Sequence, residues 1–223
     1  MTQLPIAHVR PLALTTGADR ERLMRRARIL AWGANVWHVA EFAIAVGAGV
    51  AAGSIALIGF GLDSLVEVAA GTAIVWLFTG RRLADPERAE RRAQQVIAVS
   101  FYLLAAYIAV ESARDLVAGH HPEASWVGIG LAAVTAPTMP LLARAKQRIG
   151  HELGSSATVY EGAQNMLCAY LSVALLIGLG ANALFGLWWA DPVAALVIAA
   201  VAAREGRRSW RGDACGCCAP SSA

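Results

Sequence analysis

The amino-acid sequence predicts an all-α fold, a polytopic membrane bundle of six helices with both chain termini on the cytoplasmic side. Three observations carry this prediction: an apolar composition, six apolar windows of membrane-spanning length, and basic residues confined to alternate connections. Of the 223 residues, 57% are hydrophobic and 16% are charged, and the mean hydropathy is +0.51. A soluble domain carries about 25% charged residues, so this composition indicates a membrane protein.

The six apolar windows cover residues 30–50, 54–79, 95–117, 126–143, 157–181 and 188–204. Each is close to the ~20 residues that a helix needs to cross about 30 Å of hydrocarbon. The expected organisation is a polar cytoplasmic segment at 1–28, a transmembrane domain at 29–205 and a short basic, cysteine-containing cytoplasmic tail at 206–223. Residues 1–28 lack the apolar core of a signal peptide, so the first span is expected to direct insertion.

Basic residues mark alternate connections between the spans. They precede the first span, fill the connection from the second to the third, and follow the fourth and sixth: Arg20, Arg22, Arg25, Arg26, Arg28, Arg81, Arg82, Arg88, Arg91, Arg92, Arg144, Lys146, Arg148, Arg204, Arg207, Arg208 and Arg211. Cytoplasmic loops carry such an excess of Lys and Arg. The pattern places both termini in the cytoplasm, with the plasma (cytoplasmic) membrane as the expected location. It also accounts for the net charge of +3 without a nucleic-acid partner.

Five carboxylates lie inside these apolar windows: Glu41, Asp63, Glu67, Glu111 and Glu161. An ionised Asp or Glu near the bilayer centre costs roughly 2.5–3.5 kcal/mol. We expect no Lys or Arg deep enough in the spans to neutralise them. The sequence therefore predicts that a proton or a metal cation completes these acids, which points to ion handling as the function.

Two polar sets lie near the middle of the second and fifth spans, so we expect them to meet at the midplane. Asp63 and Glu67 are four residues apart, which stacks both carboxylates on one helix face and suits a divalent cation. Glu161, Gln164 and Cys168 form one stripe at i, i+3 and i+7. We predict a midplane metal site of Asp63, Glu67, Gln164 and Cys168, with Glu161 as an accessory group nearer the cytoplasm. Hydrogen bonds across the bundle are the alternative interpretation.

Three further acids have simpler interpretations. His38 lies one turn before Glu41, which allows either a proton relay or a buried hydrogen bond. Glu111 has Arg114 three residues later, so an ion pair near the outer surface is expected. Asp191 is followed by a proline, a pattern typical of a helix N-terminus, and we expect it to cap the helix it begins.

The C-terminal residues Cys215, Cys217 and Cys218 bring three thiols within four positions. Thiolates bind soft metals such as zinc, copper(I) or cadmium, so the tail is a candidate for metal capture or delivery. Three ligands do not close a tetrahedral zinc site, and a fourth would have to come from elsewhere or from a second subunit. A reduced, metal-free tail is the alternative.

The run GSIALIGFGLDSLVE in the second span, the acid of the third span and WWADPVAALVIA at the start of the sixth resemble the membrane domain of the cation diffusion facilitator family. The similarity covers about residues 25–210. It implies a six-helix, usually dimeric, proton-coupled exporter of zinc and related divalent cations. That family pairs Asp-x3-Asp on its second helix with His/Asp-x3-Asp on its fifth, and the matching residues here are Asp63, Glu67, Gln164 and Cys168. The family's large cytoplasmic C-terminal domain is expected to be absent.

We therefore predict a transporter, not an enzyme, that exports a divalent, zinc-like cation from the cytoplasm in exchange for protons. No permanently bound cofactor is expected, and a homodimer is the assembly that the resemblance implies. Two alternatives stay open. One is a non-transporting membrane metal sensor or buffer that acts through the tail cysteines, and the other is a small proton-coupled exporter of organic cations.

Overall fold

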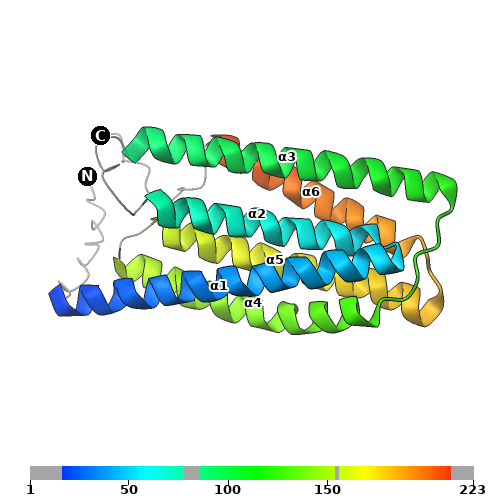
Figure 1. Ribbon diagram of the computed structural model, residues 1–223, viewed down its shortest axis with the longest axis horizontal. Coiled ribbons are helices and arrows are strands. Elements are labelled where there is room, and N and C mark those ends of the chain that lie inside the picture. Colours follow the sequence, from blue (N-terminus) through cyan, green and yellow to red (C-terminus); the bar gives the residue numbers. More distant parts are fainter. Residues whose placement is uncertain (1–16, 78–85, 154–155, 212–223) are drawn as a thin grey trace, which may run out of the picture.

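The computed structural model describes residues 17–77, 86–153 and 156–211, and these residues form six α-helices joined by short connections. The helices are α1 (Gly17–Ala52), α2 (Ile55–Leu77), α3 (Pro86–Ala118), α4 (Trp126–Leu153), α5 (Ser156–Phe185) and α6 (Ala190–Arg211). They run side by side along one axis (Figure 1), with α3 and α6 on one side, α1, α4 and α5 on the other, and α2 between. The predicted six-helix, all-α fold is confirmed.

Within the described residues, four segments are long and apolar enough to cross a membrane: Glu21–Ala52, Ile97–Ala118, Trp126–Leu153 and Glu161–Phe185. Helix α6 is not one of these four segments. Its 22 residues include the charged side chains of Asp191, Arg204, Glu205 and Arg207. Large apolar side chains such as Leu103, Ile177 and Leu184 cover the outside of the bundle. An apolar exterior is what contact with lipid requires, since hydrocarbon offers no polar partner.

Every helix except α2 extends beyond its predicted apolar window, and the extensions of α1 and α4 bear on the site. Helix α1 begins at Gly17, inside the segment expected to be a polar tail, and α4 continues from residue 143 to Leu153. The added residues 144–153 read RAKQRIGHEL, and the first five are all strong helix formers, so the helix persists although the sequence becomes charged. This extension carries Lys146 into the bundle.

A tight turn joins α1 to α2 and fixes them as neighbours. Gly53 has φ of +66°, a left-handed conformation that glycine adopts without a steric penalty. The Ser54 hydroxyl then accepts a hydrogen bond from the Leu57 backbone N–H at 3.1 Å and so caps α2. Gly49 of α1 meets Ile58 so closely that a Cβ atom there would lie 2.8 Å from the Ile58 side chain.

Asp191 also belongs to this cap, which corrects the expectation that it caps its own helix. Its carboxylate accepts hydrogen bonds from the Ser54 hydroxyl at 2.5 Å and from the Ala56 backbone N–H at 3.3 Å. Asp191 is fully buried in the first turn of α6. A carboxylate at the N-terminus of α2 is favoured by unpaired backbone N–H groups and by the helix dipole, so Asp191 holds α6 against α2.

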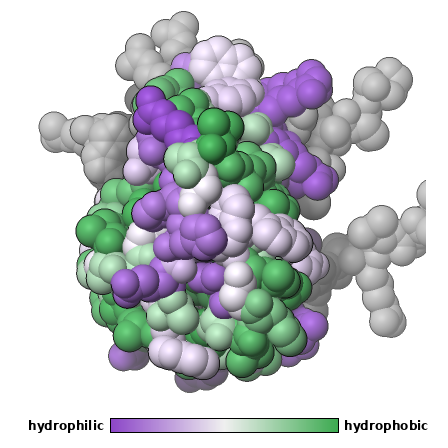
Figure 2. All heavy atoms as spheres, turned by 90° about the vertical axis from the view of Figure 1, so that its right-hand side faces the viewer, coloured by the Kyte–Doolittle hydropathy of each residue, from purple (hydrophilic) through white to green (hydrophobic). Residues whose placement is uncertain are grey.

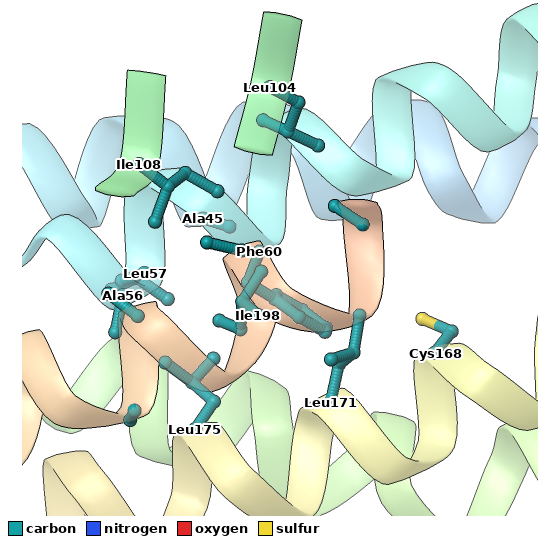
Figure 3. Packing of buried hydrophobic residues seen from close by; sticks show 14 of the residues in the cluster. Ala45, Ala56, Leu57, Phe60, Leu104, Ile108, Cys168, Leu171, Leu175 and Ile198 are labelled. Carbon is teal, nitrogen blue, oxygen red and sulfur yellow. The ribbon is translucent and has the colours of Figure 1, made fainter. Parts of the chain in front are cut away.

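The apolar core lies between α2 and the helices α3, α5 and α6. Phe60 and Leu57 of α2, Ile108 of α3, Leu175 of α5 and Ile198 of α6 are almost completely buried in it. Figure 3 shows these side chains packed together, with Cys168 at the margin of the cluster near Leu171. Seen from the end that holds the α1–α2 turn, hydrophilic groups gather over the middle of the face and apolar groups lie around it (Figure 2).

Candidate metal centre

A buried polar cluster lies between α1, α2, α4 and α5, on the opposite side of α2 from most of the apolar core. Helix α1 contributes His38 and Glu41, which are three residues apart and therefore share a face. Helix α2 contributes Glu67, and α5 contributes Asn165 and Cys168, again three residues apart. All five side chains are buried.

Three of these residues lie close enough together to hold a metal ion. One nitrogen of His38, a carboxylate oxygen of Glu67 and the Sγ of Cys168 all lie within 4.8 Å of one another. The three side chains come from three different helices, so their approach depends on helix packing and not on spacing along one segment. Imidazole, carboxylate and thiolate are the ligand types that zinc binds.

His38 contacts three other residues of the cluster. Its Nδ1 lies 3.1 Å from Glu41 Oε2 and 3.1 Å from Glu67 Oε2, and its Nε2 lies 3.0 Å from the amide nitrogen of Asn165. The Asn165 amide donates to Nε2, so the ring proton is on Nδ1, between two carboxylates. His38 therefore links the acid of α1, the acid of α2 and the amide of α5.

Glu41 is held by hydroxyl groups from two other helices. Its Oε1 accepts a hydrogen bond from Thr135 of α4 at 2.6 Å, and its Oε2 accepts one from Ser64 of α2 at 2.9 Å. The Cys168 thiol is also oriented toward Oε2, at 3.9 Å. Both carboxylate oxygens thus have partners, so Glu41 is placed to orient His38 and Cys168. A carboxylate behind a ligating histidine fixes the ring orientation in many metal sites.

Two buried oxygen atoms in this cluster have no hydrogen-bond partner within the described ranges, and these are Glu67 Oε2 and Asn165 Oδ1. His38 Nδ1 is near Glu67 Oε2, but the ring N–H makes its hydrogen bond with Glu41. A buried acceptor without a partner costs about 1–3 kcal/mol. A cation bound beside His38 would give both oxygens a positively charged partner.

The other residues predicted for the site are buried nearby. Asp63 lies one turn from Glu67 on α2, and its electrostatic neighbours are Glu67, Glu41 and Glu205 of α6. Asp63 is not a member of the group of three. Gln164 is buried on α5 beside Asn165. Metal binding by Asp63 and Gln164 stays a prediction.

Glu161 has a basic partner, which overturns the expectation that no Lys or Arg reaches the acids of the spans. Lys146 Nζ lies 3.5 Å from Glu161 Oε2, and both side chains are largely buried. The error came from the predicted end of the fourth span at residue 143. Because α4 continues as a helix, Lys146 enters the bundle beside α5 instead of lying in a cytoplasmic loop.

Other predictions fall outside the cluster. Arg114 is 2.5 Å from Glu111, which confirms the predicted pair. The three tail cysteines lie beyond the described residues, so their prediction is untouched. Sequence reasoning missed Ser64, Thr135 and Asn165, whose signal is a small polar residue inside an apolar span. It gave His38 and Glu41 either a proton relay or a buried hydrogen bond, and the structure shows the hydrogen bond. It did not group His38 with Glu67 and Cys168.

The chain matches the family model of the cation efflux transmembrane domain over residues 36–211, which contain all of α2 to α6 and the part of α1 from residue 36 onward. The match includes every residue of the polar cluster. A search of the curated proteins gave no match.

Proposed function

Because the chain belongs to the cation efflux family, we propose that it exports a divalent cation of the zinc type. Membership makes the chain an integral, multi-pass membrane protein whose activity is metal cation efflux and not catalysis. The identity of the cation, its binding site and the coupling to protons are our proposals.

One observation carries the proposed site: His38, Glu67 and Cys168 place three ligand atoms within 4.8 Å of one another in the interior. Zinc binds nitrogen, sulfur and oxygen ligands, whereas calcium and magnesium are bound by oxygen. A mixed set of one imidazole, one carboxylate and one thiolate therefore favours zinc or the softer cadmium over the hard cations. Three ligands leave a position open, for water or for Asn165, so that the cation can be released.

In this proposal His38 supplies the nitrogen ligand that a histidine on the fifth helix can supply in the family's usual site. At the matching positions of α5 this chain has Gln164 and Cys168, and it has Glu67 on α2. An imidazole from α1 restores a nitrogen ligand to the site. We keep Asp63 and Gln164 as candidates for the remaining coordination positions.

Proton exchange is the coupling that we propose. A carboxylate, an imidazole and a thiol each release or lack a proton when they bind a metal, so protons compete with the cation for the same atoms. We propose that the end where α1 begins and α6 ends faces the cytoplasm, because the excess of basic residues in the connections supports this orientation. Location in the plasma membrane and assembly as a homodimer stay predictions.

Cobalt(II) tests the site directly, because a thiolate bound to cobalt gives a charge-transfer absorption band in the near ultraviolet. The protein would carry Ser in place of Cys215, Cys217 and Cys218, so that Cys168 is the only thiol. We expect the band to form, to be displaced by zinc, and to be lost in His38→Gln and Glu67→Gln variants. A protein that folds and gives no band would refute ligation by Cys168.

Transport is measured on the same protein in proteoliposomes that enclose a zinc-sensitive dye. We expect zinc flux that is driven by a proton gradient and abolished in Glu67→Gln. Glu111→Gln is the matched control, since it removes a carboxylate from an ion pair outside the cluster. Flux of an organic cation that zinc competes against would favour the alternative exporter.

A further inference from the structure

One layer of the bundle lies directly below the proposed site, toward the end where α1 begins. Each of three helices contributes a residue one turn away from a member of the polar cluster. These residues are Asn35, three before His38 on α1, Gly71, four after Glu67 on α2, and Glu161, four before Asn165 on α5. The fourth helix, α4, adds Lys146 to the same layer.

The layer is closely packed around the Glu161 carboxylate. A Cβ atom on Gly71 would lie 2.7 Å from Asn35 Oδ1 and 3.4 Å from Glu161 Oε1, so these two oxygens face the same point on α2. The other carboxylate oxygen, Oε2, is the one that lies 3.5 Å from Lys146 Nζ. Glu161 thus turns one oxygen toward the space between α1 and α2 and the other toward the lysine.

Lys146 acts on the site although it does not touch it. Its charge is within electrostatic range of both His38 and Glu67. A buried ion pair adds little net stability, because removing two charges from water costs about as much as their attraction returns. Inside a membrane such a pair is more costly still and typically marks an ion pathway. Stability alone therefore does not explain a lysine in this position.

We propose that Glu161 is the first ligand a cation meets on its way from the cytoplasm to the polar cluster, and that the Lys146 ammonium occupies this carboxylate until the cation displaces it. The proposal rests on the proposed function, because it assigns a route to that site. The lysine is then a tethered cation that keeps the layer neutral when no metal is present. Asn35 offers a second oxygen at the same point.

The test uses Cys168 as a reporter of the route. In the full chain with Cys215, Cys217 and Cys218 replaced by Ser, Cys168 is the only thiol, and it is buried beyond the layer. Two methanethiosulfonate reagents of similar size, one cationic (trimethylammonium-ethyl) and one anionic (sulfonato-ethyl), are applied to the cytoplasmic side of metal-free proteoliposomes. The ratio of their labelling rates, followed by intact mass, reports the charge of the route.

We expect Lys146→Met to raise the cationic-to-anionic ratio and Glu161→Gln to lower it, each by about tenfold, because charged walls change the local concentration of ions by this order. The charge-swapped double variant, Lys146→Glu with Glu161→Lys, should return the ratio to that of the parent. Glu111→Gln, which removes a charge outside the layer, should leave it unchanged. Structural damage would speed both reagents equally, so the ratio separates it from the proposed role.

An unchanged ratio in folded single variants overturns the proposal, and so does failure of both reagents to reach Cys168 in every variant. If a single variant does not fold, the swapped protein decides alone, since a ratio far from the parent's overturns the proposal and a restored ratio supports it. The assay contains no metal. If the variants change the labelling ratio as expected but the parent protein does not transport zinc, the proposed function is refuted and the proposed route is not.

Discussion

Asp191 and Glu67 are both carboxylates buried in the interior of the bundle, and their surroundings differ in one respect. Asp191 accepts hydrogen bonds from the Ser54 hydroxyl and the Ala56 backbone N–H, and it joins the start of α6 to the start of α2. Glu67 has an oxygen with no hydrogen-bond partner among the residues described. It faces an imidazole and a thiol instead.

The two residues represent two kinds of buried acid: one stabilises the fold through its hydrogen bonds, and the other has an acceptor oxygen that a ligand could use. A carboxylate whose acceptors are all used stabilises the structure as it stands. A buried carboxylate with an unused acceptor is a stability cost, and it persists where a function needs it. By this criterion Asp191, Glu41 and Glu111 have hydrogen-bond partners. Glu67 Oε2 lies 3.1 Å from His38 Nδ1 but has no hydrogen-bond partner among the described residues, and we assign Glu67 to the proposed metal site.

The largest expected effect is the loss of zinc transport in the Glu67→Gln variant. The amide keeps the size of the side chain but removes the negative charge that would bind the cation. We expect zinc flux to fall by at least about 100-fold, the upper range for groups that support a metal site. The unfolding midpoint in detergent should stay near that of the parent, and a large drop in it would place Glu67 with Asp191 as a structural acid.

Asp191→Ala should give the opposite pattern. Two hydrogen bonds to a carboxylate are lost and the Ser54 hydroxyl loses its buried partner, so the free energy of unfolding should fall by about 2 kcal/mol. Denaturant unfolding followed by tryptophan fluorescence measures this change. Zinc affinity of the folded fraction should match the parent, and a loss of affinity would break the division between the two acids.

Cys168→Ser should change which metal binds more than whether the protein folds. Replacing sulfur by oxygen at one ligand weakens soft cations selectively. We expect cadmium affinity to drop by about tenfold more than manganese affinity, measured by competition against a fluorescent chelator. Equal losses for both metals would indicate that the thiol packs beside the site without binding the cation.

Glu111→Gln sets the lower limit of the scale. The Arg114 side chain is mostly exposed, and an exposed ion pair contributes about 0.2–1 kcal/mol. Both zinc flux and the free energy of unfolding should therefore change little. A loss of transport here would mean that acids with partners also serve the pathway.

The apolar windows were sufficient to predict six helices in the correct order, because each window is long enough to span a bilayer. The end of α4 was predicted wrongly, because its last turns are charged yet strongly helix-forming, and hydropathy does not register helix propensity. The Lys146–Glu161 pair was missed for that reason alone. The match of the family model also confirms the resemblance drawn from the second-span motif.

The candidate site was predicted only in part, because the missing part depends on contacts between distant segments. Glu67 and Cys168 are visible as polar residues within apolar spans. The approach of His38 to Glu67 requires the packing of α1 on α2, and the contact of Asp191 with Ser54 joins residues 137 positions apart. Spacing along one helix predicts a shared face but not the neighbour that the face meets.

The connection between α1 and α2 has a consequence for the way the bundle can open. Only Gly53 and Ser54 separate the two helices, Gly49 packs against Ile58, and the backbone N–H of Glu123 binds the Ala52 carbonyl at the turn. Helices α1 and α2 are thus one stiff hairpin. His38 and Glu67 sit on that hairpin and keep their spacing when it moves, whereas Cys168 sits on α5. A displacement of the hairpin relative to α5 would move the Cys168 sulfur away from His38 and Glu67 and leave the spacing of those two residues unchanged.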